Sequence, residues 1–191
     1  MNDDILRQIE EHARCAASLT RDASTLARIA DQLLEAFRRG RRLYVFGNGG
    51  SAADAQHIAA ELVGRFKVDR RGLPAVALST DTSSLTAISN DLGFERVFAR
   101  QIEALVAPGD VVWALSVSGR SPNVLAALRS AGQRGAWRIG FTGRTGGRLA
   151  ELCEACLRVD HESSDRVQEV HQLAYHIICD RIERAVSQDD S

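Results

Sequence analysis

The strongest constraint on the fold is the alternation of short apolar runs with longer helical patterns. Apolar runs typical of buried strands lie at residues 43–46, 75–78, 111–115, 137–142 and 155–159. Helical patterns follow at residues 51–65, 95–105, 122–133, 146–153 and 166–186, and residues 79–91 form a polar stretch. Strands that alternate with helices predict a parallel sheet with helices on both faces. We therefore expect an α/β three-layer sandwich around a mostly five-stranded parallel sheet.

The first forty residues predict two further helices that precede this sheet. Apolar stripes begin at Ile5 and at Leu26, and a break is expected near Arg21 and Asp22. The apolar faces of both helices are rich in alanine. Such faces favour packing against a neighbour, so we expect these helices to contact another subunit.

Composition excludes several classes of protein. The 191 residues amount to about one domain, and 45% apolar with 26% charged residues is typical of a globular protein. The net charge of −1 argues against a nucleic-acid partner, which requires a basic excess. No apolar run approaches the roughly 20 residues of a membrane helix. The acidic N-terminus has no apolar signal core, so a cytoplasmic location is expected.

The cysteines do not indicate a metal or redox site. The four cysteines are expected to be free thiols in a cytoplasmic chain. Cys153 and Cys156 match the C-x-x-C spacing, but a structural zinc site requires a second pair. A metal or redox role for these two residues is therefore not favoured.

Two loops that follow predicted strands have the composition of phosphate-binding turns. Residues 47–51 are glycine-rich and end in Ser51, which can cap the next helix. Residues 116–122 carry three serines before Pro122, at the start of a helix. Hydroxyls, backbone amides and a helix N-terminus suit a phosphate dianion. Capping explains one serine of the second loop but not three, so that loop is the stronger phosphate candidate. The hydroxyl-rich residues 79–84 say little by themselves.

Two predicted helices carry residues suited to metal binding or proton transfer. His57 and Glu61 lie one turn apart on one helix face, where they can bind a divalent metal, act as acid and base, or form a surface ion pair. The last helix contains Gln168, His171 and His176. The residues alone leave open which of the two late histidines faces a site.

Together these motifs resemble the sugar isomerase (SIS) domain, and within it the phosphoheptose isomerase family. The matching strings are residues 47–57, 60–62, 78–83, 90–95, 116–122 and 167–171. The resemblance implies a single SIS domain over residues 1–191, with residues 1–40 packed in a homotetramer. It implies that sedoheptulose 7-phosphate is converted to D-glycero-D-manno-heptose 7-phosphate through an enediol. That reaction begins the synthesis of nucleotide-activated heptose for lipopolysaccharide or other glycans.

The resemblance also implies site residues. Zinc, one ion per subunit, would bind to His57, Glu61, Gln168 and His176, with Glu61 and His176 carrying the proton transfers. Substrate contacts are implied for Asn48, Gly49, Gly50, Ser51, Glu61, Asn90, Asp91, Ser116, Val117, Ser118, Ser121 and Gln168.

The chain departs from the family at two positions of the serine loop, where the family reads S-T-S-G-N-S. Val117 replaces the threonine and Arg120 replaces the asparagine. The lost hydroxyl costs one hydrogen bond to phosphate, of order 1 kcal/mol. Arg120 either offsets this loss with a bidentate phosphate contact or stays solvated.

The spacing of two implied ligands bears on assembly. Gln168 and His176 are separated by about 12 Å along a regular helix and by about 80° around it. Donor atoms of one zinc ion lie only a few ångströms apart, so one straight helix does not easily supply both. Either the helix begins or distorts near Gln168, or the two ligands come from different copies of the chain, which we favour.

A rival interpretation comes from a different functional class. A non-catalytic relative in the SIS superfamily binds the bacterial replication initiator, and its final helix lacks the histidine found here at 176. Because His176 accompanies His57, Glu61 and Gln168 in this chain, we expect the enzyme.

Overall fold

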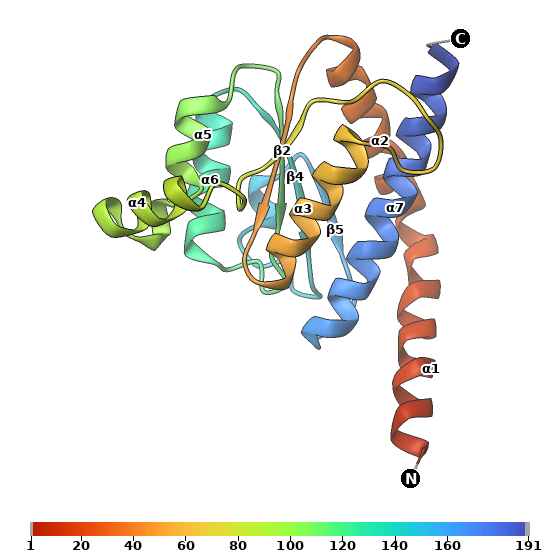
Figure 1. Ribbon diagram of the computed structural model, residues 1–191. Helices are drawn as coiled ribbons and strands as arrows, with labels where there is room; N and C mark the ends of the chain where they lie inside the picture. The colour runs from red at the N-terminus through yellow and green to blue at the C-terminus, as the bar shows by residue number, and fades with distance from the viewer. Residues whose placement is uncertain (1, 190–191) are drawn as a thin grey trace.

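A computed structural model of the protein describes residues 2–189 and contains a five-stranded parallel sheet between two helical layers (Figure 1). The strands are β1 (Leu43–Gly47), β2 (Ala75–Ala77), β3 (Val111–Leu115), β4 (Trp137–Thr142) and β5 (Ala155–Arg158). Their spatial order is β2-β1-β3-β4-β5, and Leu43 of β1 is in register with Ala75 and Val111. The predicted parallel sheet of five strands is confirmed.

The helices divide between the two faces of the sheet. They are α1 (Asp3–Ser18), α2 (Ala23–Arg38), α3 (Gly50–Val63), α4 (Thr82–Leu92), α5 (Ala99–Leu105), α6 (Pro122–Gln133) and α7 (Ser164–Asp189). Short 3-10 turns are η1 (Leu19–Asp22), η2 (Phe94–Arg96) and η3 (Ala150–Leu152). Helices α2, α3 and α7 pack on the face of β1 that presents Leu43 and Val45. Helices α5 and α6 pack on the opposite face, which presents Tyr44 and Phe46.

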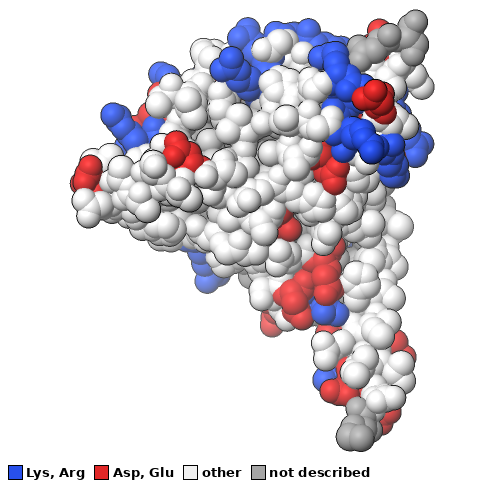
Figure 2. Space-filling model, viewed as in Figure 1, with Lys and Arg blue, Asp and Glu red and all other residues white. Residues whose placement is uncertain are grey.

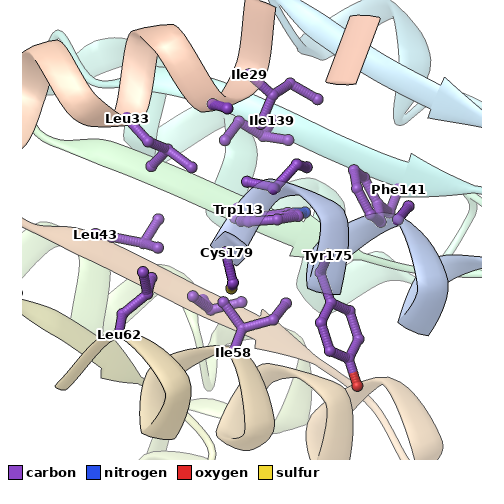
Figure 3. Packing of buried hydrophobic residues seen from close by; sticks show 14 of the residues in the cluster. Ile29, Leu33, Leu43, Ile58, Leu62, Trp113, Ile139, Phe141, Tyr175 and Cys179 are labelled. Atoms are coloured by element: carbon purple, nitrogen blue, oxygen red, sulfur yellow. The ribbon is translucent and has the colours of Figure 1, made fainter. Parts of the chain in front are cut away.

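The larger core lies between the sheet and helices α2, α3 and α7. Trp113 of β3 is fully buried at its centre and stacks edge-on against Phe141, with ring centroids 4.8 Å apart. Ile29 and Leu33 of α2 approach this layer from one side, and Ile58 of α3 approaches from the other (Figure 3). This packing fixes α3 and α7 beside each other on that face of the sheet.

Two segments differ from the sequence prediction. The polar stretch 79–91, for which no helix was predicted, contains α4, and this prediction was wrong. Asp81 caps that helix, because its carboxylate accepts a hydrogen bond of 3.0 Å from the Ser84 amide. None of its residues is buried, and the few apolar residues at helical spacing, Leu85, Ile88 and Leu92, stand among polar neighbours. The helix predicted at 146–153 is only the turn η3.

Helices α1 and α4 project from the body of the molecule (Figure 1). No residue of either helix is buried, and α1 exposes Ile5, Leu6 and Ile9. Lys and Arg side chains gather at the end of the molecule where α7 finishes, whereas Asp and Glu gather where α1 passes the start of α7 (Figure 2). Between these regions lies a broad face with few charges. Over residues 2–189, no helix combines the length and apolarity needed to cross a bilayer.

Candidate active site

A cavity of about 660 Å³ opens at the carboxyl ends of the strands, between the loops that follow β1 and β3. In open α/β sheets ligands bind at this edge. The cavity brings together eight of the implied substrate residues: Asn48, Gly50, Ser51, Ser116, Val117, Ser118, Ser121 and Gln168. Asn48 and Asn123 join the two loops through a reciprocal pair of 2.9 Å hydrogen bonds between their side chains.

The loop after β1 turns directly into α3. Gly49 precedes the helix with a φ of +53°, a backbone conformation that residues other than glycine rarely adopt. A Cβ atom on Gly50 would meet the end of the Gln168 side chain, which would have to move aside. The Gln168 side chain, from the start of α7, therefore lies directly against the first turn of α3.

The loop after β3 presents its hydroxyls at the start of α6. Ser116 and Ser121 approach each other to 3.2 Å between Oγ atoms, and Ser118 Oγ accepts from the Arg120 amide. Arg120 is exposed at the rim of the cavity. Val117 lines the cavity and packs partly against the core. The loop thus combines hydroxyls with a helix N-terminus, which is the arrangement that favours a phosphate group.

A second group of polar residues lies farther along α3 and α7. Ligand atoms of His57, Glu61 and His176 all lie within 4.8 Å of one another. His57 Nε2 is 2.8 Å from Glu61 Oε1, and the His57 and His176 rings are 5.0 Å apart. His176 Nε2 is buried without a hydrogen-bond partner. Burial, followed by the neighbouring His57, lowers the pKa of His176, which favours the neutral imidazole that binds metals.

The other late histidine serves the core. His171 is fully buried, its ring lies against Phe141, and its Nε2 is 3.3 Å from the carbonyl oxygen of Thr142. Burial lowers the pKa of His171 to about 4, although the Thr142 contact opposes this shift. Of the two late histidines, His176 is therefore the one that faces His57 and Glu61.

Gln168 lies apart from this group, at the start of α7. Its side chain lies against Gly50, and it is near enough to Asp54 to lower the pKa of that carboxyl, against the larger effect of burial. Helix α7 begins at Ser164, about one turn before Gln168, and continues without a break through His176. A distortion between Gln168 and His176 is therefore not observed, and ligands from different copies stay a prediction.

Four implied substrate residues do not line the cavity. Gly49 lies at the turn before α3, while Asn90 and Asp91 lie on the exposed α4. The Asn90 side chain donates a 2.8 Å hydrogen bond to Asp91 Oδ1, and both residues face solvent. Glu61 also lies outside the cavity, with the metal-ligand candidates.

The structure adds a buried carboxylate and a tyrosine that the sequence did not single out. Asp54 is 5% exposed, and burial raises its pKa against the opposing hydrogen bonds from Gln168 and Tyr175. The Tyr175 hydroxyl is 2.9 Å from His57 Nδ1. Asp54 stands three residues before His57, so helical periodicity could have placed it on the same face. No sequence signal distinguishes Tyr175 from an ordinary core tyrosine.

The end of α3 is fixed by a buried ion pair. Glu183 of α7 accepts hydrogen bonds from the amides of Phe66, Lys67 and Val68, at 2.8, 2.6 and 3.2 Å. Arg70 lies 3.5 Å from Glu183, and the two side chains are only 1% and 3% exposed. The Arg70 guanidinium also donates to the Glu61 carbonyl at 2.7 Å. This pair holds the loop after α3, and hence the last turn that carries Glu61.

The C-x-x-C pair is a feature of packing. Cys153 and Cys156 both pack against Gly140, where a Cβ atom would lie 2.9 and 3.3 Å from their sulfur atoms. Burial raises the pKa of both thiols, that of Cys156 to about 11. Protonated thiols are poor ligands and nucleophiles, so the pair has the properties of buried core cysteines.

Comparison with known proteins places the chain in a family. The SIS domain family matches residues 9–143. The phosphoheptose isomerase of Pelobacter propionicus is 51% identical over 187 residues, covering 97% of this chain and 99% of that protein. The phosphoheptose isomerase of Roseiflexus sp. is 50% identical, covering 98% and 93%.

Solved structures agree with these relatives. The phosphoheptose isomerase structure from Neisseria gonorrhoeae is 38% identical, has a TM-score of 0.91 and is covered over 98% of its length, with 96% of this chain aligned. The structure from Francisella tularensis is 31% identical, with a TM-score of 0.92 and coverage of 95% and 97%. The chain therefore belongs to the SIS domain family and, within it, to the phosphoheptose isomerases.

Proposed function

We propose that the protein is an isomerase that converts sedoheptulose 7-phosphate to D-glycero-D-manno-heptose 7-phosphate, acting as one SIS domain over residues 1–191. The observation that carries this proposal is the identity of about half, over nearly the whole chain, to proteins named phosphoheptose isomerase. Their name denotes an aldose–ketose isomerase. The alternative, a non-catalytic partner of the replication initiator, is not favoured by these relatives.

The spacing of the two polar groups along α3 supports a long sugar phosphate. Ser51, beside the serine loop, and His57 are separated by about 9 Å along the helix axis. An open-chain heptose 7-phosphate carries its phosphate at the end opposite to carbons 1 and 2. With the phosphate at Ser116, Ser118 and Ser121, the reacting carbons can extend toward Glu61. Residues from both groups then contact one substrate.

The reaction needs two proton movements between neighbouring atoms. A base removes a proton from C1 of the open-chain ketose while an acid protonates the oxygen on C2, which gives an enediol. Return of a proton to C2 and loss of the proton on the C1 oxygen give the aldose. We assign the carbon protons to Glu61, a side chain 19% exposed, and the oxygen protons to His176, whose ring lies 5.0 Å from that of His57.

The donor set fits a divalent metal such as zinc. Two imidazoles and a carboxylate converge within 4.8 Å, and the buried, unpartnered Nε2 of His176 is the kind of atom that a metal satisfies. We propose zinc, one ion per subunit, held by His57, Glu61 and His176 and completed by Gln168. When bound, the ion supplies Lewis-acid polarisation of the sugar oxygens. Glu61 would be a weaker base as a ligand, so its two roles compete.

We also propose a homotetramer whose sites are shared between copies. Helices α1 and α4 bury no residue, and exposed Leu173 and Ile177 of α7 join Leu19 and Leu26 in an apolar groove. A second copy covering these faces would remove them from water. Gln168 and the α4 residues Asn90 and Asp91 would then complete the site of a neighbouring copy. The product would supply nucleotide-activated heptose for lipopolysaccharide or another glycan, in the cytoplasm.

The direct test is a product assay with sedoheptulose 7-phosphate on the purified protein. The parent should convert the substrate and lose activity with a chelator, and zinc should restore it. Glu61→Gln should lower kcat by roughly 10²- to 10⁴-fold. Glu151→Gln, at an exposed position of η3 outside the cavity, is the matched control and should keep the parent rate. A parent with no activity on this substrate would refute the proposal.

Site sharing is tested by mixing two inactive variants. Glu61→Gln and His176→Ala are dissociated, combined and reassembled, and activity is compared with each variant alone. Recovered activity in the mixture supports sites built from two copies. A fully active monomer would contradict sites built from two copies, but it would be consistent with the proposed reaction.

A further inference from the structure

Tyr175 places a hydroxyl between a buried carboxylate and the imidazole of His57. Its oxygen lies 2.9 Å from His57 Nδ1, and the neighbouring Asp54 carboxylate, whose buried Oδ2 has no hydrogen-bond partner, is a group to which it can donate. The ring belongs to the core, but its hydroxyl points out of the core toward α3 (Figure 3). Asp54, Tyr175 and His57 thus form a chain of three polar groups that ends at Glu61, since His57 Nε2 is 2.8 Å from Glu61 Oε1.

The number of protons shared by these three groups determines which nitrogen of the His57 ring has a lone pair available. A hydroxyl has one proton to donate, whereas an ionised carboxylate only accepts. When Tyr175 donates to Asp54, its oxygen accepts from Nδ1–H, and the lone pair of His57 lies on Nε2. When Nε2 instead donates to Glu61, the same hydroxyl rotates and donates to Nδ1. The hydroxyl can therefore match either neutral tautomer, but only the first presents Nε2 as a ligand.

We propose that Tyr175 is a positioning residue: anchored by Asp54, its hydroxyl accepts the Nδ1 proton of His57 and presents Nε2 to a divalent cation beside Glu61 and His176. Ligating histidines commonly donate their other N–H to a carboxylate or a carbonyl, which orients the ring and fixes its tautomer. Here the hydroxyl of Tyr175 stands between the imidazole and the carboxylate, so the N–H donates to the hydroxyl and the hydroxyl donates to Asp54. The inference rests on the proposed metal site and adds a residue that acts through His57.

The arrangement predicts a specific dependence on one oxygen atom. Tyr175→Phe keeps the buried ring and removes the hydroxyl, so it should weaken zinc binding by roughly 10- to 100-fold. The matched control is Tyr44→Phe, because the hydroxyl of Tyr44 donates to the Leu105 carbonyl on the opposite face of the sheet. That variant should bind zinc like the parent. Zinc affinity is measured by competition with a chromogenic chelator, and thermal unfolding is recorded for all three proteins.

A double variant separates an effect through His57 from a general loosening of the core. In the His57→Ala background, Tyr175→Phe should cause no further loss of zinc affinity, because the imidazole it positions is gone. An equal loss in both backgrounds would show a structural role only. If Tyr175→Phe does not fold, nitrogen NMR of the zinc-loaded parent still decides the question. We expect His57 protonated at Nδ1 and bound to zinc through Nε2.

The outcomes distinguish this inference from the proposed function. Zinc bound through Nδ1, or unchanged zinc affinity in Tyr175→Phe, would overturn the role of Tyr175 while the isomerase and its metal stand. A parent that binds no zinc would overturn both the metal site and the role assigned to Tyr175. Weaker zinc binding in Tyr175→Phe alone, with Tyr44→Phe like the parent, supports the proposal.

Discussion

Acid should destabilise this protein through His171. Burial among core side chains lowers the pKa of His171 to about 4 from its ordinary 6.5, against the opposing contact with Thr142. The unfolded chain therefore takes up a proton at this residue at a higher pH than the folded chain does. As a result the contribution to stability is complete above about pH 6.5 and is lost as the pH falls toward 4.

The size of this effect follows from the two pKa values. The full difference corresponds to about 3 kcal/mol, because one pKa unit is worth about 1.4 kcal/mol. At about pH 5 the unfolded residue is almost fully protonated and the folded residue is mostly neutral, so about 2 kcal/mol of the free energy of unfolding is lost. This is a large share of the stability of an ordinary domain.

The assay is urea unfolding at about pH 7.5 and at about pH 5, at one protein concentration, for the parent and His171→Gln. Glutamine carries no charge at either pH, so the variant should lose about 2 kcal/mol less than the parent on acidification. Other titrating groups contribute equally to both proteins. Equal acid losses in the parent and His171→Gln would refute the reasoning.

Three further predictions concern the site and its support. Glu183→Ala should lower the free energy of unfolding by about 3–5 kcal/mol in urea titrations, because it leaves the buried Arg70 without a counter-charge. Ser118→Ala should raise KM for the sugar phosphate more than it lowers kcat, because a phosphate contact is equally strong before and during reaction. Gly50→Ala should lower kcat/KM, because its Cβ would displace the Gln168 side chain from the position 2.4 Å away.

Each of these has a control and a contrary result. Glu35→Ala, in an exposed ion pair with Arg39, should change stability by less than about 1 kcal/mol, and a similar loss in both glutamate variants would contradict the buried-pair argument. A fall in kcat alone for Ser118→Ala would place its contact in the transition state. Full activity in Gly50→Ala would show that the position of Gln168 is not required.

Sequence reasoning succeeded where a segment carries its own periodicity. β3 and α6 have the predicted bounds, because an unbroken apolar run marks one and Pro122 marks the first turn of the other. Helix α4 was missed because its apolar residues, Leu85, Ile88 and Leu92, are few among polar and hydroxyl-bearing neighbours, and none of them is buried. The pair His57 and Glu61 was visible as an i, i+4 spacing.

Other features of the site depend on how helices pack. His171 and His176 are rotated by about 140° from each other around α7, and only the position of the sheet decides which one meets α3. The role of the Tyr175 hydroxyl likewise depends on how closely α3 and α7 approach. These facts arise from tertiary contacts, which the sequence pattern does not encode.

In the proposed function, α3 joins the phosphate-binding end of the site to its reacting end, and it therefore limits how this enzyme can change its preference for sugar length. Adding one residue within α3 would rotate Glu61 by about 100° away from His176, and the two ends would lose their alignment. Only additions of about a whole turn, about 5.4 Å, keep both ends in phase. A tolerance for shorter or longer sugars must therefore arise in the flanking loops, where the backbone can shift gradually, and redesign is best directed there.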